Sequence, residues 1–143
     1  MGKPRTPTIF TSPQDAALAF YHAFETKDLD AMMAAWAEDE DIVCVHPGGS
    51  RLVGYDAVRA SWERIFAGNG KVSFRIEQIV TMETVGLAMQ SAVEQINAGE
   101  GAVQAAAVAT NVFMRTPSGW RMVCHHASAA PPVTAVEKKG PLH

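Results

Sequence analysis

The spacing of apolar residues changes near residue 71, from a helical repeat before it to a strand repeat after it. Before Gly70, apolar residues recur at intervals of three and four, which places them on one face of a helix. From Lys71 onward they alternate with polar residues, the pattern of a half-buried strand. Helices followed by strands predict an α+β domain, with helices packed on one face of a sheet.

Three helices are expected in the first half of the chain. The first begins after Ser12, an N-cap residue followed by Pro13. The second begins after Asp28, and the third covers residues 55–66. The apolar faces of the three helices consist of Ala17, Phe20, Tyr21 and Phe24; of Leu29, Met32, Met33 and Trp36; and of Val58, Trp62, Ile65 and Phe66.

Five strands are expected. A short β-branched run at residues 42–46 stops at Pro47-Gly48-Gly49, a strong turn signal. The other four follow residue 71 and are joined by Gly-containing turns, so they form a meander. Their expected ranges are about 72–82, 86–97, 102–116 and 120–126.

The strand expected at residues 102–116 carries small, mostly apolar residues on both faces. An antiparallel strand normally exposes one face to water. The helices can cover only one face, so something else must cover the other. We expect that cover to be a second copy of the chain, packed sheet to sheet in a homodimer.

Length and charge narrow the class of protein. The chain has 143 residues, of which 48% are hydrophobic, so we expect one compact domain at residues 12–130. Residues 1–11 and 131–143 lack an apolar repeat and are expected to form a mobile arm and a flexible tail. A net charge of -3 without a basic stripe argues against nucleic-acid binding.

The membrane and the secretory route are also not expected. No apolar run reaches the roughly 18 residues that a membrane-spanning helix needs, and the first residues lack the apolar core of a secretory signal. We therefore expect a cytoplasmic protein. Cys44 and Cys124 lie in apolar, strand-like surroundings and are expected to be reduced and structural.

Three segments carry a resemblance to a known family. They are Leu52-Val53-Gly54, Ala109–Phe113, and the stretch from Gly119-Trp120-Arg121 to His125-His126-Ala127-Ser128. In this order they resemble the SnoaL-like group of the nuclear transport factor 2-like superfamily, and also the association domain of calcium/calmodulin-dependent kinase II. The resemblance covers residues 12–130. It implies a cone-shaped, strongly curved antiparallel sheet wrapped around three N-terminal helices, with an apolar ligand pocket between sheet and helices.

The same resemblance suggests which side chains face the cone. It places Cys44 and His46 together on the first strand. On the last two strands it places the inward side chains of Asn111, Phe113 and Arg115, and of Trp120, Met122, Cys124 and His126.

Ketosteroid isomerase, a relative, uses an Asp base with a Tyr and a protonated Asp as oxyanion donors. In this chain His46 occupies the position that corresponds to the base. Phe20 or Tyr21 stands in the region of the tyrosine, and Asn111 or Val112 in that of the acid. The isomerase residues are absent, so steroid isomerisation does not carry over.

Each candidate residue has a structural alternative. His46 suits a general base, because imidazole titrates near neutral pH, and it suits equally a hydrogen bond to its own loop. Buried Asn111 needs partners, either Tyr21 or His126 or a ligand carbonyl. Arg115 suits a carboxylate at the cone mouth or plain solvation. The full set of candidates is His46 as the catalytic base, with Tyr21, Trp36, Asn111, Phe113, Arg115, Trp120, Cys124 and His126 as ligand-binding residues.

No metal or cofactor is expected. His125 and His126 are adjacent in a strand, so they face opposite sides and cannot share one metal ion. A group of His46, Cys124 and His126 lacks an acidic ligand.

Two functions remain open. The first is a small-molecule-binding or association domain with an apolar pocket. The second is a cofactor-independent isomerase, cyclase or dehydratase with His46 as base and Asn111, Tyr21 or His126 stabilising the oxyanion. The missing acidic pair favours the first, and the sequence leaves open whether the chain is an enzyme.

Overall fold

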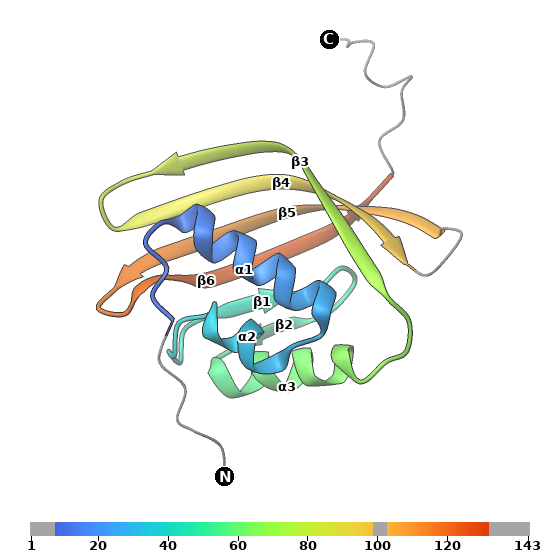
Figure 1. Ribbon diagram of the computed structural model, residues 1–143, viewed down its shortest axis with the longest axis horizontal. Coiled ribbons are helices and arrows are strands. Elements are labelled where there is room, and N and C mark those ends of the chain that lie inside the picture. Colours follow the sequence, from blue (N-terminus) through green and yellow to red (C-terminus); the bar gives the residue numbers. More distant parts are fainter. Residues whose placement is uncertain (1–7, 99–102, 132–143) are drawn as a thin grey trace.

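Three helices pack against the inner face of one curved six-stranded sheet in the computed structural model, which describes residues 8–98 and 103–131. Figure 1 shows the long strands curving around the first helix. The α+β class and the curved sheet confirm the predicted fold. In chain order the elements are α1 (Pro13–Thr26), α2 (Leu29–Ala34), β1 (Val43–Val45), β2 (Arg51–Val53), α3 (Tyr55–Phe66), β3 (Val72–Glu83), β4 (Leu87–Ala98), β5 (Val103–Thr116) and β6 (Gly119–Ala130).

The two predicted N-caps begin their helices. The Ser12 side chain accepts a hydrogen bond from the Asp15 N–H at 3.0 Å, and Asp28 accepts one from the Ala31 N–H at 3.0 Å. Each cap satisfies a backbone donor that the first turn of a helix leaves unpaired.

The core is an aromatic cluster between the helices and the inner face of the sheet. Phe20 of α1 is fully buried, with its ring centroid 5.6 Å from Trp62 of α3 and 6.4 Å from Trp36. Phe74 of β3 lies 4.5 Å from the Phe24 ring. Edge-on aromatic pairs of this kind combine a large buried area with favourable ring electrostatics. The predicted apolar faces of the helices therefore meet in one core, although Ile65 remains 38% exposed.

The sheet has the order β2-β1-β6-β5-β4-β3. Strands β3 to β6 form the predicted antiparallel meander, and β1 joins it by parallel pairing with β6. β2, a three-residue strand antiparallel to β1, was not expected from the sequence. The parallel pairing sets Cys44 opposite His125 and so brings the first and last of the described strands side by side at the site described below.

A β-bulge in β6 exchanges the two faces of that strand. Val112 pairs with Cys124 and Phe113 with Met122, so Val123 has no residue opposite it. One inserted residue moves every later side chain to the other face.

The bulge corrects one expectation about the site. Met122 faces the core before the bulge, but His125 is the buried histidine after it, at 2% exposure, and His126 is exposed. The prediction that His126 points into the cone is therefore wrong. Cys124 shares the outer face with His126 and is only partly buried.

Residues 8–11 lie against β6, although the sequence placed them in a mobile arm. The Trp120 N–H donates to the Phe10 carbonyl at 2.9 Å, and Phe10 forms a bridge with Gly119. The Arg121 guanidinium donates to the carbonyls of Thr8 and Ala34 and lies 5.2 Å from the centroid of the Phe10 ring.

Most of the mobile arm and flexible tail expected from the sequence, residues 1–7 and 132–143, lies outside the described residues.

Gly119→Ala is expected to destabilise the fold more than Gly70→Ala. Both glycines have positive φ, +94° and +97°, and a Cβ at Gly119 would lie 2.7 Å from the Phe10 carbonyl oxygen, whereas nothing lies within 4 Å at Gly70. We expect a loss of about 1 to 2 kcal/mol at Gly70 from the backbone conformation alone, and a clearly larger one at Gly119. Urea unfolding measures both; equal losses would mean that the contact with Phe10 is unimportant.

Candidate functional site

Four buried polar side chains form a chain of hydrogen bonds inside the fold, here called the interior network. His125 Nδ1 lies 2.6 Å from Asn111 Oδ1, and Asn111 Nδ2 donates to Tyr21 Oη at 3.1 Å. Tyr21 Oη then donates to Glu94 Oε2 at 2.6 Å. The residues come from β6, β5, α1 and β4, and none is more than 7% exposed. One continuous set of bonds therefore joins α1 to three strands.

Burial sets the charges of this network. Burial lowers the pKa of His125 to about 3, with His46 and His126 contributing, so the ring is neutral at pH 7. Because the Asn111 oxygen can only accept, the His125 proton resides on Nδ1. Burial raises the pKa of Glu94, an effect that the hydrogen bond from Tyr21 opposes. Burial, followed by the Glu94 charge, raises the pKa of Tyr21, so the phenol keeps its proton and remains a donor.

His46 belongs to a second group, here called the His46 group. Its Nε2 lies 3.1 Å from Ser61 Oγ and 3.6 Å from Cys44 Sγ. Ser61 donates its only hydroxyl proton to the Val58 carbonyl at 2.8 Å, so it must accept from His46. His46 therefore carries its proton on Nε2, and its neutral ring presents Nδ1 as an acceptor.

The charge state of His46 follows from its surroundings. Burial, followed by the charge of Arg64, lowers the pKa of His46, which favours the neutral ring at pH 7. Burial and the neighbouring Cys124 raise the pKa of Cys44 to about 12, so that thiol keeps its proton. A neutral half-buried imidazole beside a thiol and a hydroxyl is chemically able to accept a proton.

Trp62 contacts both the interior network and the His46 group. Its ring is perpendicular to that of His46, with centroids 4.8 Å apart, and its centroid is 6.4 Å from that of His125. His46 and Asn111 therefore belong to separate bonded groups rather than converging on a shared space. His46 and Asn111 each already have hydrogen-bond partners in the protein, which favours a structural role for both.

The other residues predicted from the sequence to bind a ligand do not lie together in the structure. Trp36, Phe113 and Trp120 are buried in the core, at 1%, 0% and 6% exposure. Trp36 Nε1 has no hydrogen-bond partner among the described residues. Arg115 is exposed, and Cys124 and His126 lie on the outer face. Of the predicted ligand-binding residues, only Tyr21 and Asn111 meet in a hydrogen bond.

Sequence reasoning missed two members of the interior network. Glu94 follows Gln90 and Ala92 on the inward parity of β4, and a lone carboxylate at such a position was an available signal. His125 gave no comparable signal, since its inward direction depends on the bulge at Val123.

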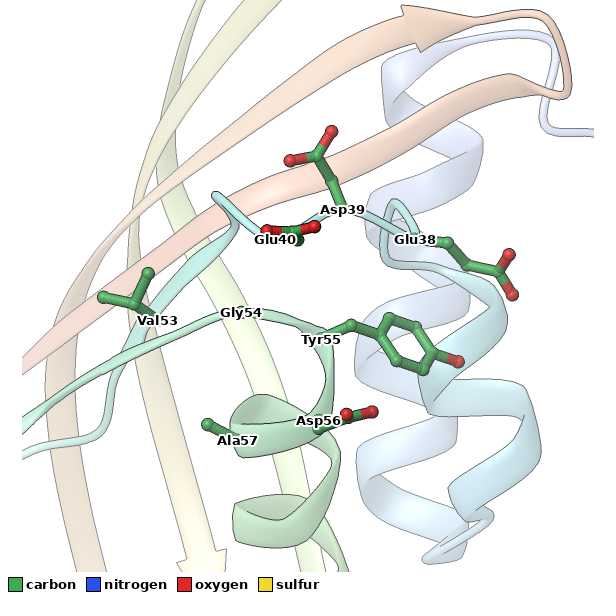
Figure 2. Close-up of a pocket in the computed structure, with 8 residues that line it drawn as sticks. All are labelled: Glu38, Asp39, Glu40, Val53, Gly54, Tyr55, Asp56 and Ala57. Carbon is green, nitrogen blue, oxygen red and sulfur yellow. The ribbon is translucent and has the colours of Figure 1, made fainter.

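Two cavities open on the surface near the segment from Trp36 to Val43. One, of about 690 Å³, lies between Glu38–Glu40 and the start of α3. Figure 2 shows Tyr55 and Asp56 on one side of it and Glu40 on the other. The second, of about 1000 Å³, is lined by Met33, Trp36, Arg121 and neighbours on β5 and β6.

Neither cavity is lined by Asn111 or His46, so the predicted pocket between sheet and helices stays a prediction. In the described ranges, no cluster of three or more His, Cys, Asp or Glu side chains is arranged to hold a metal ion. No helix in the described part of the chain combines the length and apolarity needed to cross a membrane.

Comparison with known proteins identifies the relatives of this fold. A family model described as a SnoaL-like domain matches residues 14–133. A provisionally assigned calcium/calmodulin-dependent protein kinase type II association domain from Thiobacillus denitrificans superposes with a TM-score of 0.81 at 36% identity, covering 86% of this chain and 98% of the other. A provisionally assigned dehydratase of the nuclear transport factor 2-like family from Streptomyces avermitilis superposes with a TM-score of 0.72 at 31% identity. The match covers 80% of this chain and 91% of the other.

One curated relative also matches. The F-box protein SKIP8 of Arabidopsis thaliana is 27% identical over 109 residues, 76% of this chain. The match spans only 46% of that protein, less than half of its length.

His125 is expected to make stability fall as the pH drops. Its folded-state pKa of about 3 lies below the ordinary 6.5, so between those values the unfolded chain binds one proton more than the folded chain. The free energy of unfolding should therefore decrease from about pH 6.5 downward, by up to about 1.4 kcal/mol per pH unit from this residue. Glu94, whose pKa is raised, acts in the opposite direction above its ordinary pKa.

The comparison that isolates His125 uses His125→Gln, with His22→Gln at an exposed histidine as the control. Urea unfolding between pH 7 and pH 4.5 should show a shallower pH dependence for His125→Gln only. Parallel curves for the wild type and His125→Gln would contradict a buried neutral histidine.

Proposed function

The chain belongs to the SnoaL-like domain family, and we propose that it works as an association domain that forms a homodimer through the outer face of its sheet. The family and its fold support a ligand-binding or association domain. The likeness to an association domain at 36% identity supports the second of these roles. The cytoplasm is the proposed compartment, and the free thiols of Cys44 and Cys124 are consistent with reducing surroundings.

The observation that carries this proposal is the apolar outer face, the side of the sheet turned away from α1. On β5, Val108 and Met114 are 45% and 43% exposed on this face. Leu87 on β4 lies opposite Met114, and its side chain is 46% exposed. Met82 on the neighbouring strand β3 is 66% exposed. Large apolar side chains gathered on one face mark an interaction surface.

A second copy of the same face is the partner that fits. The outward positions along β5 from Val108 to Met114 are Val, Thr, Val and Met, without a charge. A twofold dimer sets one patch against the same patch, and an uncharged row of side chains can meet itself without repulsion. The described contacts already satisfy the interior network, so association can bury apolar area without disturbing it.

Val108→Asp is expected to convert a dimer into a monomer. Two-fold pairing would bring two buried carboxylates into one apolar interface, at a cost that exceeds the gain from burial. Leu18→Asp is the matched control, because Leu18 is 69% exposed on α1, away from the outer face. Sedimentation velocity over the micromolar range measures both. A monomeric wild type, or a dimer unaffected by Val108→Asp, would contradict the proposal.

A second function, cofactor-independent catalysis on a small molecule bound within the cone, is supported by the Nδ1 acceptor of His46. The half-buried ring is neutral and fixed by Ser61, as a base needs. The likeness to a provisionally assigned dehydratase supports the same reading. In such a reaction Asn111 or Tyr21 would have to exchange its bond in the interior network for one to the substrate.

His46→Gln tests that second function. The Gln amide can replace the N–H donor to Ser61, so the melting temperature should change little, but it supplies no base. Native mass spectrometry of the purified protein first identifies a retained small molecule. On that substrate kcat should fall roughly 100-fold or more. Unchanged turnover would remove His46 from the chemistry.

A further inference from the structure

We propose that oxidation of methionines on the outer face switches the association of two copies off, an inference that rests on the proposed homodimer. Three methionines lie on this face, here called the methionine cluster: Met82 on β3, Met89 on β4 and Met114 on β5. The occupant of the face remains a second copy of this chain. What the cluster adds is a chemical change that alters the fit.

The strand register makes the cluster continuous. Met82 lies directly opposite Met89, and Met89 lies opposite Val112. Met114 is two residues beyond Val112 on the same strand, so it is the diagonal neighbour of Met89 on the same face. Directly opposite and diagonal side chains on one face of a sheet reach one another. The three sulfurs therefore belong to one patch and not to scattered positions.

Exposure separates this cluster from the core methionines. Met82 and Met114 are 66% and 43% exposed, and Met89 is partly buried between them. Met32, Met33 and Met122 are buried in the core, at 0%, 5% and 0% exposure. A dilute peroxide should therefore reach the outer face in the free protomer before it reaches the interior, and the fold should survive the reaction.

The reaction transfers one oxygen atom from a peroxide to a thioether. The peroxide O–O bond breaks, an S–O bond forms and the sulfur loses two electrons. When the oxidant is hydrogen peroxide, its second oxygen is released as water. The sulfoxide is polar and needs hydrogen-bond donors. Leu87 opposite Met114 and Val112 opposite Met89 have apolar side chains and supply none. The guanidinium of Arg121, opposite Met114 on β6, already donates to two backbone carbonyls. An oxidised face should therefore pair poorly with another copy.

Association and oxidation should compete. In the dimer the methionine cluster is covered, so only the free protomer reacts, and the rate of oxidation should fall as protein concentration rises above the dissociation constant. Because methionine sulfoxide is reducible, the change is also reversible.

The test treats the full chain with hydrogen peroxide and measures association by sedimentation velocity, with mass spectrometry locating each added oxygen. All proteins carry Cys124→Ser, which removes a partly exposed thiol from the same face. We expect sulfoxide at Met82 and Met114 first, a dissociation constant raised at least tenfold, and recovery of the dimer with methionine sulfoxide reductases. Circular dichroism should show the fold unchanged throughout.

A leucine variant supplies the control. Met82→Leu/Met89→Leu/Met114→Leu keeps the face apolar, so it should dimerise and stay dimeric in peroxide. Met32→Leu should respond to peroxide as its parent does. A dimer that persists after Met82 and Met114 are oxidised would overturn this inference and leave the association domain standing. A monomer before any peroxide is added would instead overturn the proposed function itself.

Discussion

The fold depends on a constraint at its centre: four polar side chains are buried and bonded to one another. An unpaired buried polar group costs about 1 to 3 kcal/mol, and more when it is charged. His125, Asn111, Tyr21 and Glu94 avoid that cost only while α1 holds one position over β4, β5 and β6. Apolar packing tolerates small slides of a helix, but directional bonds do not, so the interior network fixes the register between the helix and the sheet.

This constraint also bears on function. A ligand pocket was expected inside the cone, yet here Tyr21 and Asn111 bind one another. The indole of Trp62 contacts the rings of His46 and His125. A ligand in the cone must compete with bonds that are already made. The outer face has the opposite character, because its apolar side chains are exposed and gain by being covered. The proposed association therefore requires no rearrangement of the interior, whereas the proposed catalysis would.

The bulge at Val123 links the two faces of the molecule. The bulge moves the side chain of every later residue of β6 to the opposite face of the sheet. His125 therefore points into the interior network, and Cys124 and His126 lie on the outer face. Without the bulge, Cys124 would lie opposite Asn111 and His126 would point inward, as the sequence pattern suggested. A single unpaired residue thus decides which histidine is neutral and buried and which one meets solvent.

Local sequence determined much of the architecture, because helix caps, apolar repeats and turns act over a few residues. Ser12 and Asp28 start their helices, Phe20 and Trp62 face the core, and the turn at Pro117 separates β5 from β6 as expected. The sequence also predicted that Asn111 needs a hydrogen-bond partner and offered Tyr21 as one candidate. Only tertiary structure decided the pairing of β1 with β6, the bulge that turns His125 inward, and the meeting of Glu94 with Tyr21. These join residues far apart in the chain, and no local pattern reports which distant partner will satisfy a buried polar group.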